Sequence, residues 1–197
     1  MIPGVAILDG FLGRKTASAL LDFAQSHEAG FHPSKVSFKG QENVASQTRH
    51  SLTFVGDWSV LERTFRNALL RQAPDILAAT GVADWSPKHL QIDLAAYRDG
   101  GFYNTHIDTV VGAERGRITR KVSAVYYVHA EPKPFSGGEL RIRDVLTDQD
   151  CVIAPKHDRL VAFASILPHE VQPVSIAGDA FAHARFSINC WLSHKAD

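Results

Sequence analysis

After residue 89 the chain consists of short strand-like segments separated by turn residues, and this feature constrains the fold most. The six segments occupy residues 90–97, 122–129, 138–143, 151–153, 159–163 and 184–192. Turn signals lie between them, including Asp99-Gly100-Gly101 and Gly178-Asp179. Many short strands after a helical region predict a β-sandwich or a jelly roll with helices packed on one face.

The first third of the chain carries two amphipathic patterns. Apolar residues recur at helical spacing over residues 15–27 and again over residues 59–79. Ser59 and Glu62 have the spacing of a capping box at the start of the second helix. Pro74 lies inside that helix and is expected to end it or kink it.

Shorter signals complete the N-terminal region. Gly81 is the expected stop of the second helix. Residues 36–38 and 51–55 resemble short strands on either side of a polar loop, residues 40–50. The expected fold is therefore mainly β with flanking helices, a double-stranded β-helix (jelly roll) with the N-terminal helices packed on one sheet. We expect one domain, 1–197, with helical support over about 1–88 and the jelly-roll core over about 89–193.

Composition excludes several classes of protein. With 45% hydrophobic and 21% charged residues the chain is neither disordered nor of low complexity. Lysine plus arginine and aspartate plus glutamate each number 21, so the net charge is zero and a nucleic-acid-binding role is disfavoured.

Cys151 and Cys190 are expected to be buried free thiols in a reducing compartment. Without a signal-peptide pattern or an apolar run of membrane-spanning length, the sequence predicts a soluble cytoplasmic protein.

The last predicted strand alternates between two kinds of side chain. Ala184, Phe186, Ile188, Cys190 and Leu192 share one face, which is expected to pack against the helices. His183, Arg185, Ser187, Asn189 and Trp191 share the other face. That second face either is solvated or lines the inside of a barrel, and the alternation alone does not decide between them.

Three residues suggest a metal site. His106 and Asp108 would project from the same face of an extended strand, and His169 follows another strand-like segment, 61 residues after Asp108. Each is individually more typical of core or surface structure. Together, two histidines and one carboxylate form the facial triad of non-haem Fe(II) oxygenases.

Arg185 adds a candidate ligand-binding group. A buried arginine is costly unless it is paired, and no acidic residue in its own strand offers a partner. A dicarboxylic acid would serve, because guanidinium and carboxylate form two-pronged hydrogen bonds. Ser187 faces the same way as Arg185, and its hydroxyl would add a hydrogen-bond donor.

Six stretches together carry a family resemblance. They run in order as YRDGGFYNTHID (97–108), VYYV (125–128), SGGELRI (136–142), PKHDRLVAF (155–163), PHEVQPV (168–174) and RFSINCW (185–191). Over about residues 90–192 the chain resembles the 2-oxoglutarate- and Fe(II)-dependent dioxygenases, nearest the prolyl hydroxylases of the hypoxia-sensing type. The segment from Glu170 to Ala184 is longer than in close prolyl hydroxylase relatives. The intact carboxylate at Asp108 disfavours the halogenase branch.

The resemblance implies a site, residue by residue. His106, Asp108 and His169 match the Fe(II) ligands, and dioxygen and 2-oxoglutarate are the implied co-substrates. Arg185 matches the residue that pairs with the far carboxylate of 2-oxoglutarate. Candidate co-substrate contacts are three tyrosines, for each of which packing in the core is the alternative: Tyr97, Tyr103 and Tyr127.

The implied reaction is hydroxylation, but the substrate stays open. The first hypothesis is a peptidyl residue such as proline, and the second is a free amino acid or another small metabolite. A nucleic-acid demethylase is disfavoured by the zero net charge, and a non-catalytic metal- or 2-oxoglutarate-binding sensor is the alternative from another class. Two segments, 40–50 and the arginine-bearing 109–120, are expected to line the entrance. The three arginines of the second segment favour an acidic substrate, unless it is an ordinary solvated loop.

Overall fold

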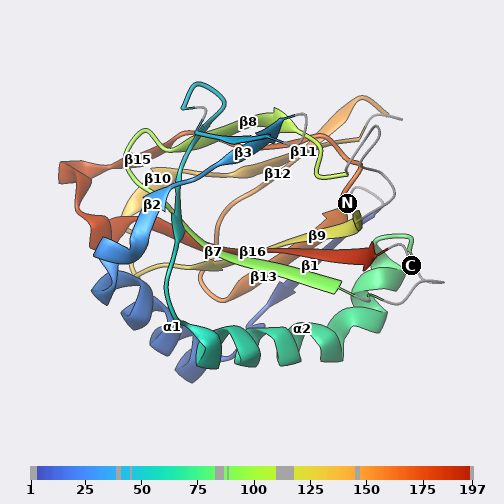
Figure 1. Ribbon diagram of the computed structural model, residues 1–197, viewed down its shortest axis with the longest axis horizontal. Coiled ribbons are helices and arrows are strands. Elements are labelled where there is room, and N and C mark those ends of the chain that lie inside the picture. The colour runs from blue at the N-terminus through green and yellow to red at the C-terminus, as the bar shows by residue number, and fades with distance from the viewer. Residues whose placement is uncertain are drawn as a thin grey trace.

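Two antiparallel sheets dominate the structure, a computed structural model that describes residues 4–38, 41–44, 46–82, 87, 89–109, 118–144 and 147–195 (Figure 1). The strands of the larger sheet are β1 (Val5–Asp9), β2 (Phe31–Pro33), β6 (Leu52–Phe54), β7 (His89–Tyr97), β9 (Ile118–Val128), β13 (Arg159–Ala164) and β16 (Arg185–Lys195). Their order across the sheet is β1-β13-β9-β16-β7-β6-β2.

The smaller sheet lies above the larger one in Figure 1. Its strands are β5 (Arg49–His50), β8 (Phe102–His106), β11 (Leu140–Asp144), β12 (Gln149–Ile153) and β14 (His169–Val171), in the order β12-β11-β14-β8-β5. Two short pairs complete the β structure: β3 (Val36–Phe38) with β4 (Gln41–Asn43), and β10 (Phe135–Gly137) with β15 (Val174–Ile176). This mainly antiparallel, jelly-roll arrangement with two helices confirms the predicted fold class.

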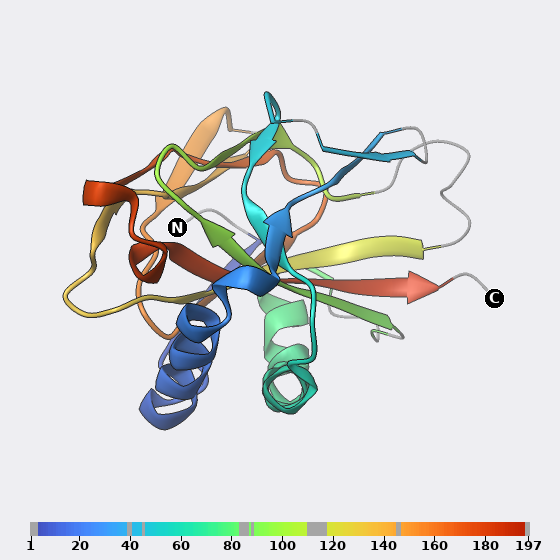
Figure 2. The same ribbon diagram turned by 60° about the vertical axis from the view of Figure 1, so that its left-hand side comes forward.

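Both α-helices cover the outer face of the larger sheet, as the two views show (Figures 1 and 2). They are α1 (Arg14–Ser26) and α2 (Ser59–Ala79). Short 3-10 turns occupy Glu28–Gly30, Ala177–Asp179 and Phe181–His183. The main core between helices and sheet includes Leu20, Leu69, Ile76, Ile188, Cys190 and Leu192. The predicted apolar face of the last strand therefore packs against the helices.

The opposite face of β16 points between the two sheets. Arg185 and Ser187 are fully buried there, and Asn189 and Trp191 line a pocket shared with the predicted metal site. The barrel-lining interpretation is correct for Arg185, Ser187, Asn189 and Trp191, and wrong for His183, which is exposed in the 3-10 turn before β16. Because β16 is flanked by β7 and β9, its inward side chains lie near the middle of the sheet.

Helix α2 departs from the sequence expectations at its start. Ser59 is not the cap: Trp58 holds that position without a side-chain cap, and the Ser59 amide donates instead to the Asp57 carboxylate at 3.0 Å. Pro74 does not end the helix, which continues to Ala79. The turn after the proline is held by packing of Ala73, Ile76 and Leu77 in the core, which outweighs one missing backbone hydrogen bond.

The end of α2 is as predicted. Gly81 follows it at φ 78°, and the Val82 amide donates to the Leu77 carbonyl at 2.9 Å, closing the helix with a left-handed turn.

Both cysteines are free, but Cys151 is only partly buried, so the expectation of two buried thiols holds for Cys190 alone. Within the described ranges, neither helix combines the length and apolar character that crossing a membrane requires.

Candidate metal centre and co-substrate pocket

Strand pairing brings the two candidate histidines together. His106 ends β8 and His169 begins β14, and the two are cross-strand partners with ring centroids 4.2 Å apart. Asp108 does not lie in a strand, contrary to expectation, because β8 ends two residues before it. Its backbone amide donates to the Ser165 carbonyl at 3.0 Å, and this hydrogen bond turns the carboxylate toward the histidines.

The donor atoms of the triad converge. His106 Nε2 lies 3.7 Å from Asp108 Oδ1, and His169 Nε2 lies 3.3 Å from Asp108 Oδ2. All three ligand atoms are within 4.8 Å of one another. No second group of three such side chains occurs among the residues that the structure describes. This donor set, two imidazoles and one carboxylate on one side, fits Fe(II) with positions left for other ligands.

Backbone carbonyls set the tautomer of each histidine. The Nδ1–H of His106 donates to the Asn104 carbonyl at 2.8 Å, and that of His169 donates to the Leu167 carbonyl at 2.9 Å. Because a neutral imidazole carries one proton, both Nε2 lone pairs are left to face the centre. This second contact also holds each ring in orientation, as in established metal sites.

The charges of the triad suit metal binding at neutral pH. The pKa of His106 is lowered to about 4, first by burial and then by the nearby His169, whose effect is larger than the opposing effect of Asp108. The imidazole is therefore neutral at neutral pH. Burial alone would raise the pKa of Asp108, but the two neighbouring imidazoles, His169 before His106, and the hydrogen bond from Ser123 favour the ionised carboxylate and hold its pKa well below its usual range. Asp108 is therefore ionised.

Ser123, which the sequence analysis did not single out, orients the carboxylate. Its hydroxyl donates to Asp108 Oδ2 at 2.6 Å and lies 2.9 Å from the Ser165 hydroxyl. Ser123 lies on β9, on the inward side, as does Tyr127 four residues later. The strand alternation places Ser123 inward, but no motif marks it as a neighbour of the metal site.

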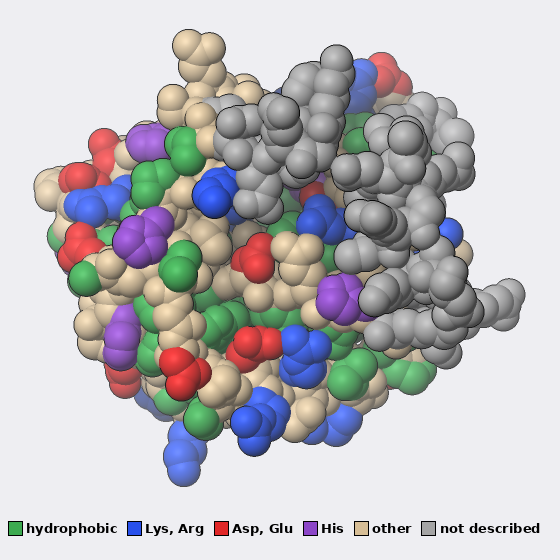
Figure 3. Space-filling view, in the orientation of Figure 1, with side chains coloured by type: hydrophobic (Ala, Val, Ile, Leu, Met, Phe, Trp, Pro, Cys, Tyr) green, Lys and Arg blue, Asp and Glu red, His purple; other side chains and the backbone are tan. Residues whose placement is uncertain are grey.

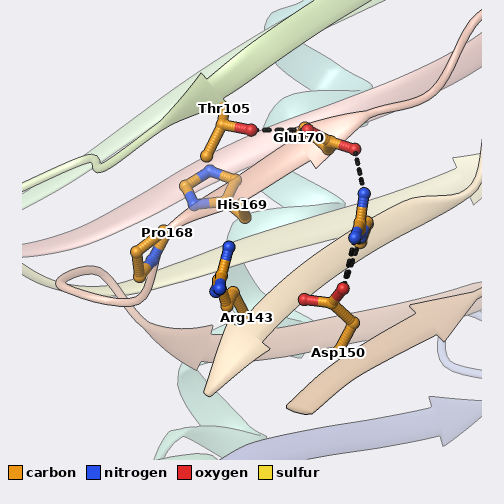
Figure 4. Close-up of a pocket in the computed structure, with 7 residues that line it drawn as sticks. Thr105, Arg143, Asp150, Pro168, His169 and Glu170 are labelled. Carbon is orange, nitrogen blue, oxygen red and sulfur yellow. Dashed lines mark hydrogen bonds and ion pairs between the residues drawn. The ribbon is translucent and has the colours of Figure 1, made fainter. Parts of the chain in front are cut away.

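A polar ladder runs across the outer face of the smaller sheet behind the triad. Thr105 donates to Glu170, Glu170 contacts Arg141, and Arg141 pairs with Asp150. Figure 4 shows these side chains reaching from strand to strand beside His169. Because Thr105 and Glu170 are sequence neighbours of the two histidines, the ladder links the strands that carry them.

Arg185 forms a second buried polar site, separate from the metal-ligand triad. Its side chain is 1% exposed, and its Nε donates to the Gly138 carbonyl at 2.8 Å. Both terminal nitrogens, like the Tyr127 hydroxyl, are buried without a hydrogen-bond partner among the described residues. Such orphaned donors are costly and point to an absent anionic partner. A dicarboxylate such as 2-oxoglutarate fits them.

The predicted tyrosines divide between the two centres. The Arg185 guanidinium carbon lies 4.8 Å from the Tyr97 ring and 4.9 Å from the Tyr127 ring. Burial raises the pKa of Tyr127 to about 12, opposed by the Arg185 charge, so it keeps its proton. Tyr103 stacks on His106 with ring centroids 3.6 Å apart and is on the metal side.

Ser187 is buried, and its hydroxyl donates a long hydrogen bond of 3.4 Å to Asn189 Oδ1. Its contact with the co-substrate stays a prediction. Of the predicted entrance segment 109–120, residues 110–117 lie outside the described part of the chain. Arg120 is described and lies in β9, not in a loop, with its guanidinium 4.2 Å over the Trp191 ring. Arg49, from the other predicted entrance segment, lies 4.9 Å over the Tyr103 ring.

Comparisons with known proteins agree with this geometry. The sequence profile of the 2OG-Fe(II) oxygenase superfamily matches residues 92–193. An uncharacterized PKHD-type hydroxylase from Synechocystis is 31% identical over an alignment of 160 residues that covers 77% of this chain. The chain spans about half, 52%, of that relative's length.

Two solved structures show the same fold. A Pseudomonas putida prolyl-4-hydroxylase superposes with a TM-score of 0.72 at 23% identity, covering 97% of this chain and 93% of its own. A Trichoplax adhaerens prolyl hydroxylase, in complex with a hypoxia inducible factor peptide fragment, gives a TM-score of 0.69 at 20% identity. It covers 96% of this chain and 83% of its own.

Proposed function

The chain belongs to the 2OG-Fe(II) oxygenase superfamily, and we propose that it is a dioxygenase that hydroxylates a C–H bond of its substrate. Family membership implies Fe(II) and 2-oxoglutarate. One observation carries the proposal: a converging His-Asp-His set shares Tyr97 with a buried guanidinium whose two terminal nitrogens lack a hydrogen-bond partner within the described residues.

Each part of the cofactor set has residues suited to it. His106, Asp108 and His169 would hold Fe(II), and Arg185 would hold the far carboxylate of 2-oxoglutarate. When bound, the metal and its co-substrate supply the activation of dioxygen that hydroxylation requires. The protein contributes fixed donors, a charged clamp and a dry site.

The chain's own groups have separable tasks in that scheme. Two backbone carbonyls keep the imidazoles in one tautomer, and the Ser123 hydroxyl fixes the Asp108 carboxylate. The Gly138 carbonyl holds Arg185 Nε, so the guanidinium presents its two terminal nitrogens to the ligand. No side chain is needed as a titrating base for breaking the C–H bond.

For the substrate we propose a peptidyl residue, with proline first. Support comes from the similarity in fold to two prolyl hydroxylases, one of which is complexed with a peptide fragment. The second candidate is a free amino acid or small metabolite. A cytoplasmic location, expected from the sequence, stays a prediction.

A nucleic-acid substrate is disfavoured by charge. The net charge is zero, and on the face shown in Figure 3 basic and acidic side chains are interspersed. A protein that grips phosphates usually gathers its lysines and arginines on one surface.

A mass-spectrometric screen tests the proposal. The Fe(II)-loaded protein, with 2-oxoglutarate and air, is incubated with prolyl peptides and separately with free amino acids, beside an Asp108→Ala control. We expect a gain of one oxygen atom in one class, lost in the control. Gain by a free amino acid and by no peptide would refute the peptidyl hypothesis. Metal and 2-oxoglutarate binding without any turnover would favour the sensor.

A further inference from the structure

A second cavity opens beside the metal centre and is lined by charged side chains of both signs, among them Arg49, Arg120 and Asp93. Its volume is about 420 Å³, and Asp108 and Tyr103 line both it and the smaller pocket that contains the triad. Because the cavity reaches the metal-binding carboxylate from outside, it is the space in which a substrate would lie.

Arg49 is held in place from one side only. Its Nε donates to the Ser51 hydroxyl at 2.7 Å, and that hydroxyl donates to Ser34, which contacts Thr53. Ser51 and Ser34 are buried, so the anchor is a chain of fixed hydroxyls and not solvent. The guanidinium also packs over the Tyr103 ring, which stacks on His106. A side chain anchored in this way loses little further conformational freedom on binding.

The other end of Arg49 is open. Within the described residues, its two terminal nitrogens make no hydrogen bond or ion pair. Arg120, by contrast, is engaged: it donates to Gln91 at 2.7 Å and lies 3.9 Å from Asp108 Oδ1. The guanidinium end of Arg49 is thus a two-pronged donor that lines a cavity next to the metal site and is bonded to no acceptor in the described part of the chain.

We propose that Arg49 binds a carboxylate of the substrate and so directs a neighbouring C–H bond toward the metal centre. A planar guanidinium end matches the two oxygens of a carboxylate, and the aromatic ring below it leaves the edge free. The carboxylate is either that of a free amino acid or that of an acidic side chain in a peptide. This inference rests on the proposed function and names its substrate class.

Matched pairs of probes test the assignment. The free-acid arm compares L-proline with L-prolinamide, and the peptide arm compares N-acetylated, C-amidated Gly-Pro-Asp-Gly with Gly-Pro-Asn-Gly. Binding is measured by calorimetry under anaerobic conditions with protein loaded with Fe(II) and 2-oxoglutarate. In at least one arm the carboxylate member should bind about tenfold tighter, as expected for a hydrogen bond to a charged group. The arm that responds identifies the source of the carboxylate.

Two variants show whether Arg49 is responsible. In Arg49→Gln the preference for the carboxylate member should disappear. In Arg63→Gln, which removes an exposed arginine of helix α2, the preference should persist. Equal binding by both members of every pair, or binding by none, overturns the proposal, as does a preference that survives in Arg49→Gln.

The absorption band of the Fe(II)–2-oxoglutarate chelate is recorded for each sample before probes are added. Absence of the band in the wild type would be a failure of the proposed function itself. A band without any carboxylate preference would refute only the role of Arg49. Loss of the band in Arg49→Gln would also overturn the proposal, because the arginine would then serve the co-substrate.

Discussion

Replacing Gly138 with alanine should weaken 2-oxoglutarate binding and leave metal binding intact. Gly138 lies at φ +71° against the Arg185 side chain. An added Cβ would lie 2.6 Å from Arg185 Cδ, which is closer than real contacts allow, and 3.0 Å from Val174 Cγ2, which is a tight contact. Arg185 is the longer and more flexible neighbour, so its guanidinium should move away from its position over Tyr97 and Tyr127.

The magnitude follows from two separate costs. The left-handed backbone costs an alanine about 1–2 kcal/mol, which lowers the free energy of unfolding. Complete loss of a buried charge pair costs ~2–5 kcal/mol, and this bounds the effect of Arg185→Ala on 2-oxoglutarate binding. A displaced guanidinium retains part of that interaction. Gly138→Ala should therefore raise the Kd for 2-oxoglutarate by about tenfold to a hundredfold, less than Arg185→Ala does.

The assay is calorimetric titration of 2-oxoglutarate into protein saturated with Mn(II), a redox-stable substitute, together with a separate metal titration. Gly81→Ala is the control, because Gly81 has a similar φ of +78° and nothing within 4 Å of its added Cβ. It should reproduce the loss of stability without the loss of affinity. Unchanged 2-oxoglutarate affinity in Gly138→Ala would refute the role given to the Arg185 position.

Two further predictions concern the metal centre. Ser123→Ala removes the hydroxyl that orients Asp108 and should weaken metal binding by about tenfold or more, measured by competition with a chelator; an affinity equal to that of the wild type would contradict this role. The metal-free protein should also lose stability on acidification, because the pKa of His106 is about 4 in the folded state and 6.5 in the reference state. The unfolded chain then takes up the proton first, and the free energy of unfolding should fall by at most about 3 kcal/mol between pH 6.5 and 4. Urea denaturation at several pH values checks this, and a His106→Asn variant with the same pH dependence would count against it.

The metal-binding candidates could be found from the sequence because each belongs to a motif. His106 and Asp108 are two residues apart, and His169 lies in the PHEVQPV stretch. Their convergence nevertheless depends on pairing β8 with β14, and on the hydrogen bond from Asp108 to Ser165, neither of which is visible in a local pattern. Alternation along the last strand placed Arg185 on the face opposite the helix-packed residues but did not decide whether that face is buried, and the structure places Arg185 between the two sheets.

The remaining site residues come from segments without a distinctive pattern. Ser123 is one of many serines, and its role depends on the fold bringing strand β9 within hydrogen-bond distance of Asp108. Arg49 lies in a two-residue strand, β5, that only pairing with β8 defines. A local rule also failed at the start of helix α2, where the Asp57 carboxylate accepts a hydrogen bond from the Ser59 amide and Ser59 does not cap the helix. Tertiary contacts decided the places of Ser123 and Arg49.

The central claim is that one pocket holds Fe(II) and 2-oxoglutarate together. Anaerobic titration of both into the protein, followed by visible absorption beside a His106→Ala control, tests it most directly. We predict a metal-to-ligand charge-transfer band that forms in the wild type and is absent in the variant. Tight Fe(II) binding without that band when 2-oxoglutarate is added would contradict the account.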